Sequence, residues 1–435
     1  MIVPFVTPFV CVFLQQQPGE SDIDRAIRQD AAAASAAESS GAATAPPTVS
    51  PSPSPSPSSS APAAAAPVPD GQQVVRRPGS SLMNPAMSVI MDGTFGYYGR
   101  HRADFEAARL PIAGDDPSLA NEGLGVQEVE VALQSAIDPY LEGALFLTIP
   151  NLQGIEVEEG YLVTTALPFS LQVKAGTFRS QVGRNNTQHL HLQNFTRRPL
   201  FTSLLFGADG LRGPGAQASI LLPLPWFATV YAEAFSLPSP DDPATVSTFG
   251  GGGRRDPHNL TYTAALEQYW DTTENANLLL GLNVATGRLF DCAGMDPCPA
   301  GGARAPRTLL YGADLTFRWR PANVVQSYAS VQWTTEYFCR VITGGGQREG
   351  AGYTEPVVQV ARRWYVGARF DVVGLPSSDN LPRRYGYSGS LTFAPSEYSR
   401  FRLYAQEIAG PGTPGSTVAF FQTEVSLGAH GAHAY

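Results

Sequence analysis

The sequence has few charged residues for its length and, beyond residue 14, no long apolar run. Asp, Glu, Lys and Arg make up 15% of the 435 residues, while aromatic residues reach 10%. A typical soluble protein of this size carries more charge, and a membrane-spanning helix needs roughly 18–20 apolar residues in succession. Both classes are therefore disfavoured. The formal net charge of -9 also gives no reason to expect nucleic acid as a partner.

The sequence also lacks the short motifs of common enzyme classes. It contains no G-x-S-x-G, no H-E-x-x-H and no P-loop, so we expect neither catalysis nor a bound cofactor. Cysteine is scarce, with only four residues. Cys292 and Cys298 flank the short segment CAGMDPC, which predicts a local disulfide in an oxidising compartment. Two free thiols in a loop are the alternative.

The first 82 residues differ in composition from the rest. Residues 1–18 contain an apolar run of signal-peptide length that lacks a basic start. Residues 41–71 form a Pro/Ser/Ala tract, which cannot bury a core. We therefore interpret 1–18 as a signal-like segment, 19–82 as a low-complexity periplasmic tether and 83–435 as the folded domain.

Apolar and polar residues alternate along many segments of this domain. In LLYGADLTFRW, residues 309–319, Leu309, Leu315 and Phe317 share one parity, and Asp314 and Arg318 share the other. This is the period of a β-strand and not of a helix. The segments are long enough to cross a bilayer as tilted strands, and short turns alternate with long connections, as in outer-membrane barrels. We predict an all-β transmembrane antiparallel barrel of about sixteen strands; a soluble all-β protein is the alternative.

Aromatic residues near the predicted strand ends favour a membrane barrel, whose interfaces carry aromatic girdles. They are Tyr161, Trp226, Trp270, Trp319, Trp333, Trp364 and Tyr398. Sixteen strands also leave an aqueous lumen. For each charged residue of inward parity, a solvated wall position is the default role. The predicted lumen-facing residues are Glu128, Glu130, Lys174, Asp314, Arg318, Glu336, Arg369, Arg400 and Arg402.

The long connection 179–213 breaks the alternation. In porin-like barrels a long early loop folds back inside and narrows the channel, and this loop has apolar residues that need a surface to pack on. We expect its arginines to face water, where guanidinium groups attract anions. The predicted constriction residues are Arg179, Arg184, Asn186, His189, His191, Arg197, Arg198 and Arg212.

His189 and His191 leave three interpretations open. Residues two apart in an extended segment point the same way, so both imidazoles could hold one metal ion. However, the pair offers only two ligands, and neither Cys nor an acidic residue lies within ten residues of it in the sequence. We therefore expect no metal here. Side chains that anchor the folded loop, or a solvated outer loop, are the alternatives.

Four segments resemble a family of proteobacterial outer-membrane proteins. They are NPAMSVIMDGTFGYY (84–98), EVEVALQSAIDPYLEGALFLTI (128–149), the stretch 155–200 and the ending VSLGAHGAHAY. The family resembles phosphate-selective and general porins, and its members are often labelled zinc-regulated TonB-dependent outer membrane receptors. Barrels of TonB-dependent receptors have 22 strands and a plugged lumen, which this domain is too short to supply. The resemblance implies the outer membrane of a Gram-negative bacterium, with the tether in the periplasm.

We therefore expect an outer-membrane channel for passive diffusion of small hydrophilic solutes or ions, anions included. A substrate-specific receptor or transporter linked to zinc or TonB, and a structural or anchoring barrel, are the alternatives. The expected partners are outer-membrane lipid, the barrel assembly machinery and the solutes. The oligomeric state stays open between a single barrel and a homotrimer.

Overall fold

The structure is a computed structural model that describes residues 85–99, 122–207, 210–237, 249, 260–288, 306–321, 328–343, 346–378, 381–411 and 413–428. The chain divides into two compact units, 1–65 and 66–435, and every described residue belongs to the second. The predicted signal-like segment, the tether, and Cys292 with Cys298 lie outside the described residues. No helix of the described chain is long and apolar enough to cross a membrane.

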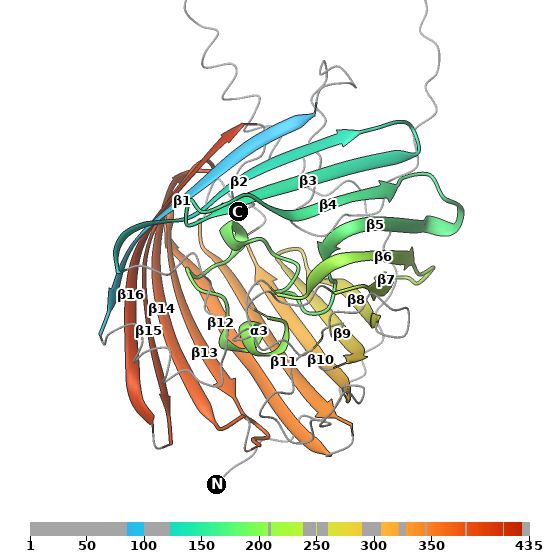
Figure 1. The fold of residues 1–435 in the computed structure, drawn as a ribbon. Helices are drawn as coiled ribbons and strands as arrows, with labels where there is room; N and C mark the ends of the chain where they lie inside the picture. Colours follow the sequence, from blue (N-terminus) through green and yellow to red (C-terminus); the bar gives the residue numbers. More distant parts are fainter. Residues whose placement is uncertain are drawn as a thin grey trace, which may run out of the picture. The chain divides into compact units, whose positions relative to one another are not determined.

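The described chain forms a closed barrel of sixteen antiparallel strands (Figure 1). Each strand pairs with its neighbours in the sequence, and β1 closes the barrel on β16. The predicted fold is thereby confirmed. The strands are β1 (Ala86–Tyr98), β2 (Gly123–Ala136), β3 (Leu141–Pro150), β4 (Glu156–Thr164), β5 (Leu171–Arg179), β6 (Arg212–Leu221), β7 (Phe227–Phe235), β8 (Thr261–Thr273), β9 (Ala276–Arg288), β10 (Arg307–Trp319), β11 (Ser330–Ile342), β12 (Gln347–Ala361), β13 (Trp364–Val373), β14 (Arg384–Ser396), β15 (Ser399–Gly410) and β16 (Thr413–Gly428).

The two faces of the wall have the reverse of the usual polarity. In β1, Met91 and Phe95 are exposed on the outside, whereas Asp92 between them is buried on the inside. In β10, Leu315 is exposed and its neighbour Asp314 is buried. A soluble protein buries its apolar residues and exposes its charges. An apolar outer face around a polar interior is the pattern of a barrel that meets lipid.

β11 and β12 extend further than the sequence predicts. Alternation in the sequence is clear over 323–338 and 355–362, and the stretch 341–353 between them has the composition of a long loop, but the pairing continues to Ile342 opposite Gln347. The glycines of this stretch indicated a loop. In the barrel they make room instead, because a Cβ at Gly352 would lie only 2.8 Å from the Tyr337 ring and one at Gly350 only 2.4 Å from its hydroxyl.

One strand contains a β-bulge that changes which side chains face inward. Between β3 and β4, Phe146 pairs with Glu159 and Leu147 pairs with Val157, so Glu158 is an extra residue. As a result Glu158 and Glu159 are both buried. The bulge also reverses the parity of the rest of β4, and Tyr161 points inward and is buried. The prediction that Tyr161 belongs to an outer aromatic girdle is therefore wrong.

The main apolar cluster lies inside the barrel. It joins the short helix α3 (Leu200–Leu205) to side chains of the surrounding strands. In Figure 1, α3 lies within the ring of strands. The core is thus formed between the wall and a segment that enters from the β5–β6 connection.

Candidate functional site

The connection between β5 and β6, whose described residues are 180–207, 210 and 211, lies in the lumen and is called the inserted loop below. Its two ends meet at one point, where the Ser180 amide donates to the Leu211 carbonyl at 2.9 Å. The Asn186 amide group closes the same neck. Its Nδ2 donates to the carbonyls of Ser180 (2.8 Å) and Leu211 (3.1 Å), and its Oδ1 accepts from the Leu211 amide (2.7 Å). Asn186, a predicted constriction residue, therefore closes the loop on itself.

Backbone amides of the inserted loop bind acceptors on the far wall. The Gly183 amide donates to Asn283 Oδ1 of β9 at 3.1 Å, and the Asn185 amide donates to Glu336 Oε1 of β11 at 2.6 Å. The approach is close, since a Cβ at Gly183, whose φ is +83°, would lie 2.9 Å from Glu336 Oε2. The predicted lumen residue Glu336 thus binds the loop.

Arginines of the wall bind carbonyls of the same loop from another side. Arg400 Nη2 of β15 donates to the His191 carbonyl at 2.7 Å. Arg402 Nη2, also of β15, donates to the Gln193 carbonyl at 2.9 Å. Arg369 Nη1 of β13 donates to the Arg197 carbonyl at 2.9 Å, again from the wall. The three guanidinium groups were expected to line a solvated wall, but they are buried and hold the loop in place.

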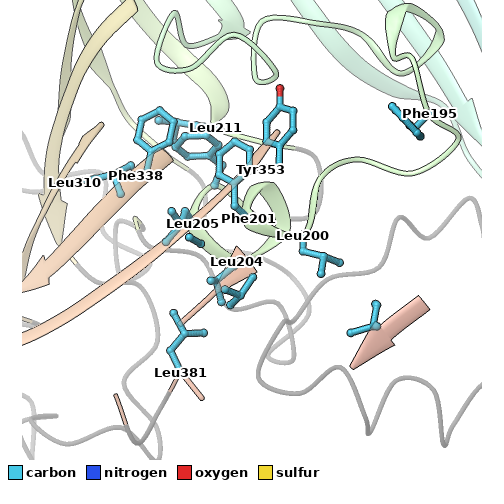
Figure 2. Packing of buried hydrophobic residues seen from close by; sticks show 14 of the residues in the cluster. Phe195, Leu200, Phe201, Leu204, Leu205, Leu211, Leu310, Phe338, Tyr353 and Leu381 are labelled. Atoms are coloured by element: carbon cyan, nitrogen blue, oxygen red, sulfur yellow. The ribbon is translucent and has the colours of Figure 1, made fainter. Parts of the chain in front are cut away.

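The end of the inserted loop that contains α3 packs against β11 and β12 through aromatic rings (Figure 2). Phe201 is fully buried and stacks on Phe338 (centroids 5.6 Å apart, interplanar angle 8°) and on Tyr353 (5.5 Å, 14°). Phe206 meets Phe338 edge-on at 5.4 Å. The prediction that the apolar residues of this loop pack on the barrel wall is confirmed. Those residues are Phe195, Leu200, Phe201, Leu204, Leu205 and Phe206.

The arginines of the loop and of its two ends were predicted to face water, but they are buried. Arg179, Arg184, Arg197 and Arg198 keep only 4–9% of their surface exposed. Arg197 Nη1 donates to Gln406 Oε1 at 3.3 Å, and Arg198 Nη2 donates to the Gln188 carbonyl at 3.2 Å. Oxygen atoms of the wall and of the loop itself therefore accept the hydrogen bonds that water was expected to accept.

The other predicted residues lie on the strands and do not belong to the loop. Arg212 begins β6 and is only partly buried, with Nη1 donating to the Val157 carbonyl at 3.2 Å. Lys174 Nζ lies over the Tyr161 ring at 4.6 Å, a cation–π contact inside the barrel. Glu128 and Arg318 are half-buried. Asp314 is buried and accepts from Asn283 Nδ2 at 2.7 Å.

His189 and His191 meet three glutamates of the wall. His189 Nδ1 lies 3.2 Å from both Glu130 Oε2 and Glu158 Oε2, and its Nε2 lies 2.8 Å from Glu159 Oε1. His191 Nδ1 lies 3.2 Å from the same Glu130 Oε2. All five side chains are buried. The sequence places no acid near the histidines, but β2 and β4 supply three, and the bulge in β4 lets the consecutive residues Glu158 and Glu159 both face inward.

The electrostatics of this histidine–glutamate cluster are dominated by the carboxylates. Burial alone lowers the pKa of His189, but the charges of Glu158 and Glu130 outweigh it and raise that pKa well above its usual value. Arg179 also contacts Glu158. The cluster can therefore hold positive charge, either as imidazolium or as a bound cation. Glu130 was predicted to face the lumen, and Glu158 has the same inward parity in the sequence; Glu159 was not expected to face inward.

Comparison with known proteins places the chain in a family. A protein of Aquifex aeolicus described as an uncharacterized protein is 30% identical over 352 residues, which are 73% of this chain and 72% of the relative. The chain belongs to the same family as this Aquifex protein. No protein-family model matches the sequence.

Solved structures share the fold. They include OprB of Pseudomonas putida at high pH (TM-score 0.51, 12% identity, 79% of this chain and 94% of that one). They also include an anion-selective porin of Comamonas acidovorans (TM-score 0.50, 10% identity, 79% of this chain and 99% of that one). A third is a loop L8 deletion mutant of OmpT, an outer membrane protein of Vibrio cholerae (TM-score 0.50, 11% identity, 79% of this chain and 99% of that one). At these identities the likeness shows a porin-like barrel fold. The label of a TonB-dependent receptor finds no support in it.

Proposed function

From the porin-like barrel fold, we propose that the protein is an outer-membrane channel for passive diffusion of small hydrophilic solutes. The inserted loop is its constriction. The observation that carries the proposal is the position of the loop. It enters at the β5–β6 edge and is bound by β9, β11, β13 and β15. A segment held at so many points around the lumen narrows any path through the barrel and fixes its width.

The surface of the barrel supports a membrane location. Met91, Phe95 and Leu315 are exposed outward, while the charged residues between them face inward. Trp226 and Trp270 pair at 6.5 Å, and Trp364 and Phe393 at 4.7 Å, close to the short connections of the barrel. Such aromatic groups suit a lipid–water interface. We place the short connections and the tether on the periplasmic side, as in bacterial outer-membrane barrels.

Conductance of the purified, refolded chain in a planar bilayer tests this function. A passive channel gives stepwise conductance that rises linearly with salt concentration and does not saturate at low solute. Failure to conduct, in a barrel shown to be folded by its heat-dependent gel mobility, would contradict the proposal. A structural or anchoring barrel would give that result.

The second candidate is a substrate-specific channel or receptor. The dense bonding between loop and wall favours it over a wide general pore, because fixed donors and acceptors at a constriction select among solutes. The two candidates differ in one measurement. A specific channel shows conductance blocked by low concentrations of its solute, whereas a general pore does not. Association as a homotrimer is tested separately by the mass of the detergent complex.

A further inference from the structure

The histidine–glutamate cluster has the donor atoms of a metal site. Glu130 Oε2, Glu158 Oε2 and His189 Nδ1 offer three ligand atoms that all lie within 4.8 Å of one another. His191 Nδ1 lies 3.2 Å from Glu130 Oε2, but it falls outside this group of three. Imidazole nitrogens together with carboxylate oxygens suit zinc and neighbouring transition metals better than Mg²⁺ or Ca²⁺, which take oxygen ligands alone.

The distances fit one small ion. Ligand atoms about 2.1 Å from a tetrahedral zinc ion are roughly 3.4 Å from each other. The three contacts between histidine and glutamate around Glu130 and Glu158 are each 3.2 Å. A direct hydrogen bond between charged groups is usually shorter, about 2.7–2.9 Å. The two contacts of His189 Nδ1 lie within hydrogen-bond range, and the same spacing also suits atoms that share one ion.

Atoms without a well-aligned hydrogen bond lie around the same cluster. His191 Nδ1 is buried and makes no well-aligned hydrogen bond, although it lies 3.2 Å from Glu130 Oε2. The same is true of His189 Nε2 and Glu159 Oε1, although they lie 2.8 Å apart. Buried polar atoms in native proteins are nearly always satisfied. A metal ion would use the lone pair of His191 Nδ1, and binding through His189 Nδ1 would leave Nε2–H for Glu159, the usual support for a ligating histidine.

The charge balance leaves room for a cation. Glu158 contacts Arg179, and Glu159 Oε2 accepts from the Arg179 backbone amide at 3.1 Å. Glu130, by contrast, contacts only the two histidines among the ionisable groups that the structure describes. A buried carboxylate without a counter-charge is costly. With neutral imidazoles, a divalent ion supplies the missing charge.

We propose that the inserted loop and the barrel wall share a binding site for one divalent transition-metal ion. Its ligands are Glu130 of β2, Glu158 of β4 and His189 of the inserted loop. His191, beside Glu130, is a fourth ligand that has to move toward the ion. Glu159 accepts from the second nitrogen of His189 and orients it. The ion joins the inserted loop to the β2–β4 side of the barrel. The aromatic residues of the loop join the loop to β11 and β12 on another side. The site does not depend on the protein being a channel.

Zinc binding by the full chain, refolded in detergent and freed of metal by a chelator, tests this site. Wild type is expected to take up one Zn²⁺ per chain, counted by mass spectrometry of the eluted protein. The variant His189→Gln/His191→Gln should bind at least about 100-fold more weakly, since both nitrogen ligands are lost. A matched control is His430→Gln/His433→Gln, which removes the other closely spaced histidine pair and should keep wild-type affinity.

Two further measurements keep the result decisive. If the double variant does not fold, Glu130→Gln, which retains the side-chain shape, takes its place and should lose affinity to a similar extent. Co²⁺ bound to wild type should show the visible absorption of a tetrahedral nitrogen–oxygen site, without the thiolate bands that binding by cysteine would give. The proposal is overturned if wild type binds no Zn²⁺ more tightly than about 10 μM, or if the folded variants bind it like wild type. The cluster would then be an imidazolium–carboxylate network only.

Discussion

Two parts of the inserted loop are fixed to the wall by different kinds of contact. They are called here its apolar end, which contains α3, and its histidine end, which contains His189 and His191. At α3, Phe201 lies between Phe338 and Tyr353, and the contact consists of buried apolar area. At the histidine end, His189 and His191 meet buried carboxylates, and the contact consists of charge. Burial of apolar area is non-directional and does not depend on protons or metal ions. Buried charges hold only while each is neutralised, so this end can respond to protons or metal ions.

The largest expected effect comes from the apolar end. Phe201→Ala removes a fully buried ring, and truncation of such a residue costs about 3–5 kcal/mol. We expect α3 to detach from β11 and β12 while the barrel stays closed, since the strand pairing does not involve Phe201. Limited proteolysis should then cut within 195–207 at least tenfold faster than in wild type, and single-channel conductance should rise.

The matched control for this prediction is Phe169→Ala, which removes a phenylalanine ring that is 87% exposed in the turn before β5. It should leave the proteolysis rate of the loop and the conductance unchanged. Equal effects of the two variants would show that the aromatic packing does not fix the loop.

A second, smaller effect should follow from opening the neck of the loop. Asn186→Ala removes three hydrogen bonds and leaves buried backbone groups of Ser180 and Leu211 with fewer partners. Such a loss costs about 1–3 kcal/mol per unsatisfied group. Both ends of the loop should become more mobile, which hydrogen exchange over 180–211 would detect. Asn194→Ala, which removes one side-chain bond to Glu355, should raise exchange less; the reverse order would argue against the neck as a clamp.

The histidine end shows where sequence reasoning stops. Period-two alternation predicted sixteen strands and an inward Glu130, because a strand of regular pleat reveals its faces directly. It could not predict the bulge in β4, since one extra residue in a ladder leaves no mark on composition. Glu159 therefore had outward parity in the sequence, although it faces His189 in the barrel. The search for metal ligands near the histidines in sequence missed acids that pairing of distant strands brings close.

The same comparison explains the wrong expectation for the arginines. From sequence, a charged loop inside a water-filled barrel should keep its guanidinium groups hydrated. The apolar contacts of Phe201 and Leu204 instead draw the loop against the wall. Arg197 then finds an oxygen acceptor on the wall, and Arg198 finds one within the folded loop. Which partners they find depends on packing across the lumen, and local sequence does not contain that information.

Glu159→Gln sharpens the contrast at the polar end. In the proposed metal site Glu159 only orients His189, and loss of such a supporting carboxylate typically weakens metal binding by about 10–100-fold. Zinc competition with a coloured chelator should show this loss, which is smaller than that of the histidine double variant. Conductance should change little, because α3 remains packed. An affinity equal to that of wild type would mean that Glu159 does not support His189.

The smallest expected effect concerns ion preference. Arg184, Arg197 and Arg198 were predicted to attract anions from a water-filled constriction, and replacing all three by glutamine tests how much of that role remains. Because they are largely buried and bonded, their field in the open part of the lumen is partly compensated. The reversal potential in a salt gradient should therefore shift toward cations by an amount equivalent to less than about twofold in the permeability ratio. Arg362→Gln/Arg363→Gln, which removes two exposed charges at a turn between β12 and β13, is the control and should not shift it. A large shift in the triple variant would show that these guanidinium groups do act on passing ions, and that the polar end of the loop, like the apolar end, sets the properties of the channel.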